Sequence, residues 1–215
     1  MSTIDKLASS LNRRDEVPNQ ELAKQIATKK DEKAVQELVE NLNNKSKDIQ
    51  SDCIKVLYEI GEINPTLIAD HAKDFISLLE HKNNRLQWGA MIAINSITLE
   101  NPKLVYASIV KIVEAADKGS VITKDNAVKI LIKLCSLKLY ATNAFALLNE
   151  QLLRSQTNQL PMYAENAIPI INDSNKDIFI KTLTSRLDDI DEDTPKRKRV
   201  EKVIKKFSKK QRVCT

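Results

Sequence analysis

The chain has 215 residues, of which only 3 are glycine and 6 are proline, while 42% are hydrophobic and 29% are charged. Average usage would place about 15 glycines in a chain of this length. The low glycine content therefore argues against folds that need many tight turns, such as β-sandwiches and barrels. Because Gly61, Gly89 and Gly119 are widely separated, the chain also lacks the clustered glycines of phosphate-binding loops.

The formal net charge of +5 divides unevenly along the chain. Residues 195–215 contain ten Lys or Arg and one acid, whereas the remaining residues contain 24 bases and 28 acids. The body is therefore mildly acidic, and the basic character belongs to the C-terminal tail.

The first 18 residues are predicted to form an amphipathic capping helix. Ser2 or Thr3 can cap it, and its apolar face consists of Ile4, Leu7, Ala8 and Leu11. The segment has charges at Asp5 and Lys6 and no apolar region, so no signal peptide is expected. No run in the chain reaches the roughly 18 apolar residues of a membrane span. We therefore expect an intracellular, cytoplasmic protein.

A repeat with a period of 37 residues follows. Residues 49–68 match residues 86–105, and the turn Asn64-Pro65 falls on Asn101-Pro102. Two further steps of 37 place Ala90 on Ala127 and Ala127 on Ala164. Such self-similarity is typical of arrays of stacked structural repeats.

Each copy contains two predicted helices, because apolar residues recur at spacings of 3 and 4 before and after the turn. In the first clear copy the second helix spans about residues 67–80. A degenerate first repeat is predicted near residues 19–28 and 35–42. Proline disfavours the α conformation of the residue before it and is tolerated in a first helical turn, so Asn64-Pro65 and Asn101-Pro102 separate helices. Pro169 lies within an opening helix and should kink it.

This pattern resembles HEAT-repeat proteins of the armadillo-type superhelix class over residues 19–190. The resemblance implies an all-α, right-handed α-α superhelix of about five helix pairs. The Asp and Arg or Lys that HEAT repeats often carry at fixed places do not recur at one offset, since Asp70, Asp74 and Lys111 are out of register. The subfamily is therefore not identified.

The segment 191–215 is predicted to be an acidic-to-basic, helical tail. Val200, Val203, Ile204 and Phe207 fall at helical spacing. This stripe is interpreted as a cap on the last repeat, while the cations offer three alternatives. They could bind a polyanion, act in a membrane-surface or calmodulin-type helix, or, in a eukaryote, form a nuclear-import signal. The candidate residues are Lys196, Arg197, Lys198, Arg199, Lys205, Lys206, Lys209 and Lys210.

Motifs for catalysis are missing from the sequence. His71 and His81 have no ligand-type partner at the i,i+4 spacing, and Cys53 and Cys135 lie in apolar runs and are expected to be buried, reduced thiols. No catalytic residue, metal or cofactor is expected. Trp88, the single tryptophan, is interpreted either as packing against the neighbouring repeat or as an anchor in a binding groove.

The leading functional hypothesis is a non-enzymatic scaffold or adaptor that grips a protein partner along the concave face of a solenoid, with no small-molecule substrate. The second helices are expected to line that face. Their exposed residues, mixed in sign, are Asp70, Lys73, Asp74, Ser77, Lys111 and Glu114.

Two alternatives stay open. One is a scaffold that associates with nucleic acid through the basic tail. The other is an enzyme, because some HEAT-like proteins of this size resemble the alkylpurine DNA glycosylase family, which implies a basic groove with an acid and several aromatic residues. The acidic body and single tryptophan argue against that enzyme.

Overall fold

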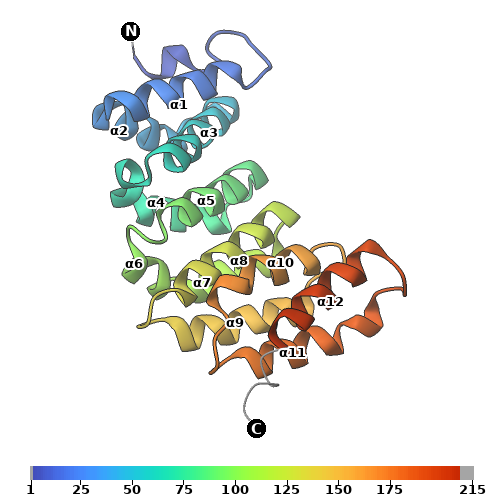
Figure 1. The fold of residues 1–215 in the computed structure, drawn as a ribbon. Coiled ribbons are helices and arrows are strands. Elements are labelled where there is room, and N and C mark those ends of the chain that lie inside the picture. The colour runs from blue at the N-terminus through green and yellow to red at the C-terminus, as the bar shows by residue number, and fades with distance from the viewer. Residues whose placement is uncertain (1, 209–215) are drawn as a thin grey trace. The chain divides into compact units, whose positions relative to one another are not determined.

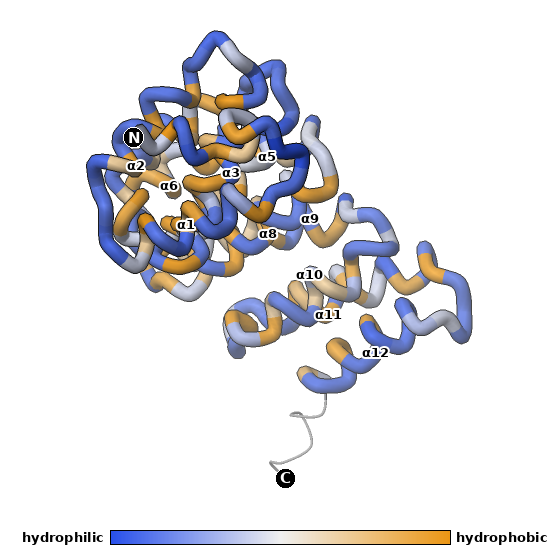
Figure 2. The backbone as a smooth tube through the Cα atoms, turned by 90° about the horizontal axis from the view of Figure 1, so that it is seen from above, coloured by the Kyte–Doolittle hydropathy of each residue, from blue (hydrophilic) through white to orange (hydrophobic). Residues whose placement is uncertain are grey.

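The computed structural model describes residues 2–208, which form helices, 3-10 turns and connecting loops only (Figure 1). The all-α prediction is confirmed. The chain divides into two compact units at Ala127 and Val128. Helix α8 (Val121–Cys135) crosses this division. Figure 2 shows hydrophobic positions recurring along the helices of each unit, as expected for helices that each bury one face.

The first unit contains three helix pairs. In chain order, α1 is followed by α2, α3 by the broken segment η3–α4–η4, and α5 by α6 and α7. The elements are η1 (Ile4–Lys6), α1 (Val17–Lys29), α2 (Glu32–Glu40), η2 (Asn41–Asn43), α3 (Lys47–Ile63), η3 (Pro65–His71), α4 (Ala72–Ser77), η4 (Leu78–Glu80), α5 (Asn84–Ile97), α6 (Pro102–Ala107) and α7 (Ile109–Lys118). The repeat period is confirmed, but the second helices of the two clear copies, within Pro65–Glu80 and Pro102–Lys118, are broken, whereas the sequence predicts continuous helices.

Local chemistry explains where these helices begin and end. Asn64 and Asn101 leave the helical conformation directly before Pro65 and Pro102, as the proline turns require. The Asn83 side chain accepts a hydrogen bond from the backbone N–H of Arg85 at 3.0 Å, which caps the start of α5.

The N-terminal segment differs from the predicted helix. Only Ile4–Lys6 form a 3-10 turn, and Leu11 is 45% exposed. Hydrogen bonds hold this segment against the first repeat instead. The buried Asn19 side chain accepts from the Ala8 backbone N–H at 3.0 Å, and it donates to Asp52 at 2.7 Å. The segment therefore packs through a polar anchor as well as through its buried apolar residues.

Gly61 and Gly89 allow close helix packing and do not adopt unusual backbone conformations. A Cβ atom on Gly61 of α3 would lie 2.3 Å from Ser96 Oγ of α5, and one on Gly89 would lie 2.7 Å from Ile54. Within the described residues the positive-φ positions are Asn12, Lys30 and Asp193, and none of them is glycine. Low glycine content thus fits a fold whose turns rarely need the left-handed region.

The second unit holds the remaining part of α8 and the helices that follow it. These elements are α9 (Ala141–Arg154), α10 (Leu160–Ala167), η5 (Ile168–Ile170), α11 (Lys176–Ser185), η6 (Leu187–Asp189) and α12 (Pro195–Ser208). The prediction that Pro169 lies inside the opening helix and kinks it is wrong, because α10 ends at Ala167 and Pro169 stands in the 3-10 turn that follows.

An arginine closes one helix end in this unit. The Arg186 guanidinium donates to the carbonyls of Leu152 and Leu153 at 2.7 Å and of Ser155 at 2.8 Å. These carbonyls end α9 and have no partner further along that helix. Arg186 is only 11% exposed, so it acts as a C-terminal cap that reaches across from the end of α11.

Among residues 2–208, none of the helices is both long and apolar enough to cross a membrane. Cys53 is fully buried and Cys135 partly buried, and both are free thiols. Burial raises the pKa of each to about 12. Cys214 lies outside the described residues.

Candidate protein-binding face

The six residues predicted to bind a protein partner lie on three segments of the first unit. Asp70 lies in η3, Lys73, Asp74 and Ser77 lie in α4, and Lys111 and Glu114 lie in α7. All are exposed except Lys111, which is partly buried. The Lys111 ammonium forms an ion pair with Glu80 at 2.8 Å, and this hydrogen bond lowers the pKa of Glu80. Their role in binding stays a prediction.

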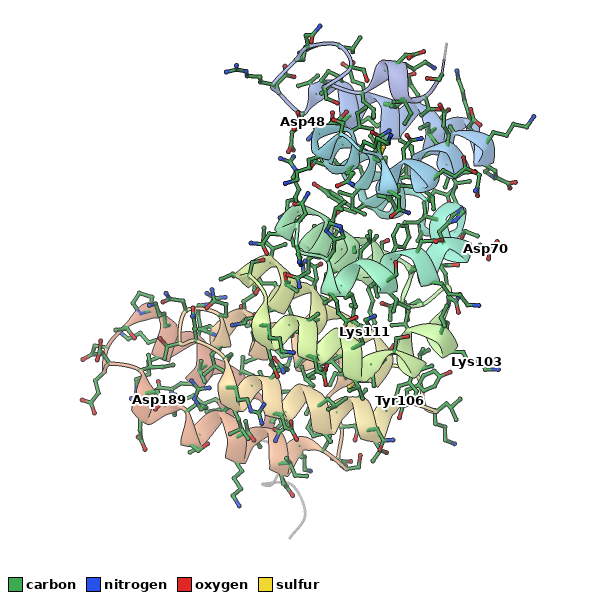
Figure 3. The ribbon with its side chains drawn as sticks, turned by 180° about the vertical axis from the view of Figure 1, so that it is seen from behind. Asp48, Asp70, Lys103, Tyr106, Lys111 and Asp189 are labelled. Carbon is green, nitrogen blue, oxygen red and sulfur yellow. The ribbon has the colours of Figure 1, made fainter. Side chains whose placement is uncertain are left out.

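The opening helices α1, α3 and α5 make more extensive contacts with one another than do the second helices α2, α4 and α7. In a curved stack, the layer whose helices lie closer together is the inner one. The packing therefore favours the opening helices as the inner layer of this unit, whereas the sequence assigned that layer to the second helices. In Figure 3, Asp48 of α3 and Asp70 of η3 lie on opposite sides of the unit.

An ion network joins the three opening helices. The Lys55 ammonium of α3 lies 2.9 Å from a Glu16 carboxylate oxygen at the start of α1 and 2.6 Å from Glu59. Glu16 also pairs with Arg85 of α5 at 2.5 Å. The Lys55 side chain is only 7% exposed, whereas Glu16 is 45% exposed. Glu16 thus links all three helices, while its side chain stays partly exposed to solvent.

The pKa values of this network follow from its contacts. The hydrogen bond from Lys55 is the main reason that the pKa of Glu16 is lowered. Burial disfavours the charged form of Lys55, but hydrogen bonds to Glu59, Tyr58 and Glu16 outweigh burial, and the pKa of Lys55 is raised. Lys55 is therefore a buried ammonium group whose charge is compensated by the two carboxylates.

Trp88 packs against the neighbouring repeat, as one of its two interpretations held. Its ring centroid lies 5.8 Å from that of Tyr58 on α3, with the planes inclined by 51°. Tyr58 is buried, whereas Trp88 is partly exposed. The Arg85 guanidinium lies 5.9 Å from the Trp88 centroid, within the range of a cation–π contact. Trp88 thus keeps part of its ring available to a partner.

Acidic side chains on α3 and apolar side chains on and just after α5 lie on the solvent side of these two neighbouring helices. We call them the α3–α5 face and define it by Asp48, Glu59 and Glu62 of α3, by Trp88 and Ile92 of α5, and by Leu99 in the turn that follows α5. Each set recurs at helical spacing on the solvent side of its helix. Leu99 is 50% exposed, and Trp88 and Ile92 are partly exposed. Asp48 and Glu62 form no ion pair within residues 2–208.

One end of the α3–α5 face is hollowed by a cleft of about 660 Å³. Asp48, Ser51 and Asp52 of α3 line it, together with Glu16 and Arg85 and with residues of the N-terminal segment that include Arg13, Arg14 and Asp15. The cleft therefore adjoins the ion network and continues the face toward the N-terminal segment.

Sequence reasoning missed Lys55 and the rest of the network. A signal was present, because Lys55 stands inside the apolar run Cys53–Leu57, at a position that a solvated lysine would not occupy. Its carboxylate partner Glu16 is distant in sequence, so no spacing rule connects the two residues.

The basic tail is divided by the structure into engaged and solvent-facing cations. Arg197 donates to the Leu187 and Ile190 carbonyls at 2.8 and 2.9 Å, and Arg199 forms two hydrogen bonds with Glu165. Lys196 hydrogen bonds to Asn158. Lys198, Lys205 and Lys206 are exposed on α12. Lys209 and Lys210 lie outside the described residues.

Comparison with solved structures shows the fold. The chain is similar to a designed armadillo repeat protein in complex with the peptide (KR)4, with a TM-score of 0.65 and 14% identity, over 95% of this chain and 97% of the other. A second designed armadillo repeat protein matches with a TM-score of 0.59 and 15% identity, covering 95% and 98%. An engineered protein matches with a TM-score of 0.57 and 17% identity, covering 96% and 98%.

The expected armadillo- and HEAT-like repeat solenoid is therefore confirmed as the fold class. No protein-family model matches the chain, and no curated protein matches it.

Proposed function

We propose that the chain is a non-enzymatic scaffold that binds an extended, basic segment of a partner protein along the α3–α5 face. The observation that carries the proposal is the partly exposed Trp88 on α5, which packs against the helix α3 that carries the unpaired carboxylates Asp48 and Glu62. Tryptophan buries a large area with few rotamers and is enriched at binding hot spots.

The charge of the face supports a basic partner. Its carboxylates Asp48 and Glu62 form no ion pair within the described residues, and Lys55 and Arg85 of the same two helices are already paired with Glu16. Electrostatic complementarity would bring Lys or Arg side chains of a partner to these carboxylates. A designed protein of the same fold is bound to the basic peptide (KR)4, which makes this peptide a suitable probe.

The apolar part of the face favours a protein segment, and not a free cation, as the partner that binds there. Trp88 and Ile92 of α5 and Leu99 just after it expose apolar surface. Burying such surface favours binding by roughly 25 cal/mol per Å². A partner segment that carries both basic and apolar side chains would use both halves of the face.

Calorimetric titration of the full chain with (KR)4, and with an acidic peptide of the same length, tests the proposal. We expect saturable binding of (KR)4 only. The variant Asp48→Asn/Glu62→Gln removes two surface charge pairs worth about 0.2–1 kcal/mol each, so affinity should fall about 2- to 30-fold.

A matched variant distinguishes the two faces of the unit. Asp70→Asn/Asp74→Asn removes the same charge from the second helices, on the side that the sequence favoured, and should leave the affinity for (KR)4 unchanged. A loss confined to this variant would move the site to the second helices. Absence of (KR)4 binding by the wild-type chain would refute a basic partner.

A further inference from the structure

The outward side of α12 carries a row of lysines. Lys198, Lys202, Lys205 and Lys206 are all exposed and are spaced at i, i+4, i+7 and i+8. They line a shallow cleft of about 410 Å³ together with Glu201. Lys198 lies 3.5 Å from Asp193, whereas Lys202, Lys205 and Lys206 form no ion pair or hydrogen bond within the described residues. We call these four residues the α12 lysine face.

The opposite side of α12 is held in place by packing. Val200 and Val203 are buried, and the Phe207 ring meets Phe179 of α11 edge to face, with centroids 5.9 Å apart. The apolar stripe of this amphipathic helix is thus covered by α10 and α11. The orientation of the lysines follows from that docking, because the apolar side of α12 packs against α10 and α11.

Arginines on the same helix reinforce the docking. Arg197 donates to two backbone carbonyls and pairs with Glu201 at 3.2 Å. Arg199 forms a bidentate contact with Glu165 of α10, at 2.6 and 2.9 Å. The two arginines are therefore occupied within the unit, and the lysine face supplies the cations that remain available.

We propose that the α12 lysine face binds the phosphate backbone of a nucleic acid without reading its sequence. The four lysines span about 12 Å along the helix axis. A DNA duplex carries one charge per about 1.7 Å of its axis, so several phosphates come within reach of this row.

Two other partner classes fit less well. A membrane-surface helix inserts an apolar face among lipids, but the apolar stripe of α12 is covered by protein. Protein–protein interfaces are depleted in lysine and enriched in aromatic residues, and the lysine face contains no aromatic side chain. Phosphate contacts need charge alone, which is what this face presents.

The test is the salt dependence of binding to a random-sequence 20-base-pair DNA duplex by the full chain. Four phosphate contacts contribute about −3.6 to the slope of log affinity against log salt, which is a loss of roughly 100-fold between about 50 and 200 mM salt. The variant with Lys198, Lys202, Lys205 and Lys206 each changed to Gln should bind more weakly at low salt, and its slope should be smaller by about 3 to 4.

A control variant separates the location of charge from its amount. Changing Lys6, Lys24, Lys29 and Lys33 to Gln removes four exposed lysines from the first unit, and binding should be unchanged. Circular dichroism should show that both variants keep the helical content of the wild type. The proposal is overturned if both variants lose binding equally, or if the α12 variant keeps the wild-type slope. Equal binding of poly-glutamate by the wild-type chain, again lost in the α12 variant, would replace nucleic acid with an acidic protein.

Discussion

Changing Glu16 and Glu59 together to glutamine should leave the Lys55 ammonium buried without a carboxylate. The substitutions keep the length and the hydrogen-bonding oxygen of each side chain, so they change charge more than shape. Lys55 is 7% exposed and lies 2.9 and 2.6 Å from the two carboxylates. Breaking a buried pair by removing the partner of a charge costs about 3–5 kcal/mol, and we expect a loss of this size in the free energy of unfolding.

A third substitution tests whether the buried, uncompensated charge of Lys55 causes this loss of stability. Lys55→Met in the same background removes the charge and leaves an apolar side chain of similar length. Replacement of a buried ion pair by apolar residues is often neutral or stabilising, so the triple variant should return to within about 1 kcal/mol of the wild type.

Urea unfolding followed by Trp88 fluorescence measures these differences, because Trp88 lies beside Tyr58 in the same layer. Arg85→Gln serves as the control, since it removes only the partly exposed Arg85–Glu16 pair and should cost less than about 1 kcal/mol. A double variant that loses no more than this control would refute the reasoning. So would a triple variant as unstable as the double one.

Further outcomes follow from other parts of the structure. Arg186→Met should cost about 1–3 kcal/mol in thermal or urea unfolding, because carbonyls at the end of α9 lose their donor, and an unchanged stability would show that water replaces the guanidinium. Gly61→Ala should cost about 1–3 kcal/mol through its clash with Ser96, and additional substitution of Ser96 by Gly should recover part of the loss. Glu165 has a pKa lowered chiefly by its hydrogen bond from Arg199, so its contribution to stability is present above pH 4.5 and is lost as pH falls through the lowered value. The melting temperatures of wild type and Arg199→Gln should therefore differ at pH 7 and converge near pH 3, whereas a constant difference would contradict the electrostatic cause.

The repeat architecture could be predicted from the sequence because its signals are local and recur. The Asn64-Pro65 and Asn101-Pro102 turns fix the helix boundaries, and the apolar spacing fixes which side of each helix is buried. The breaks in the second helices could not be predicted, since a 3-10 turn and an α-helix place apolar residues at nearly the same spacing. Segment Pro65–Glu80 shows this, because it alternates between the two conformations.

The candidate binding face was harder to predict, because it depends on which layer packs more closely. Spacing shows that a helix has a polar side, but it does not show whether neighbouring helices converge on that side. The Lys55–Glu16 pair could not be predicted for a similar reason, since the two residues meet only after α1 and α3 stack. The docking of the tail helix could be predicted, because Val200, Val203 and Phe207 recur at helical spacing in the sequence and form one apolar stripe.

The central claim is that a basic peptide binds on the α3–α5 face, and Trp88 tests it most directly because the chain contains no other tryptophan. Addition of (KR)4 should quench or shift the Trp88 emission in a saturable way, with the same dissociation constant as calorimetry. Raised salt should weaken both signals together, since the carboxylates of the face supply part of the attraction. Binding of (KR)4 by calorimetry with an unchanged Trp88 emission would place the peptide elsewhere and contradict the claim.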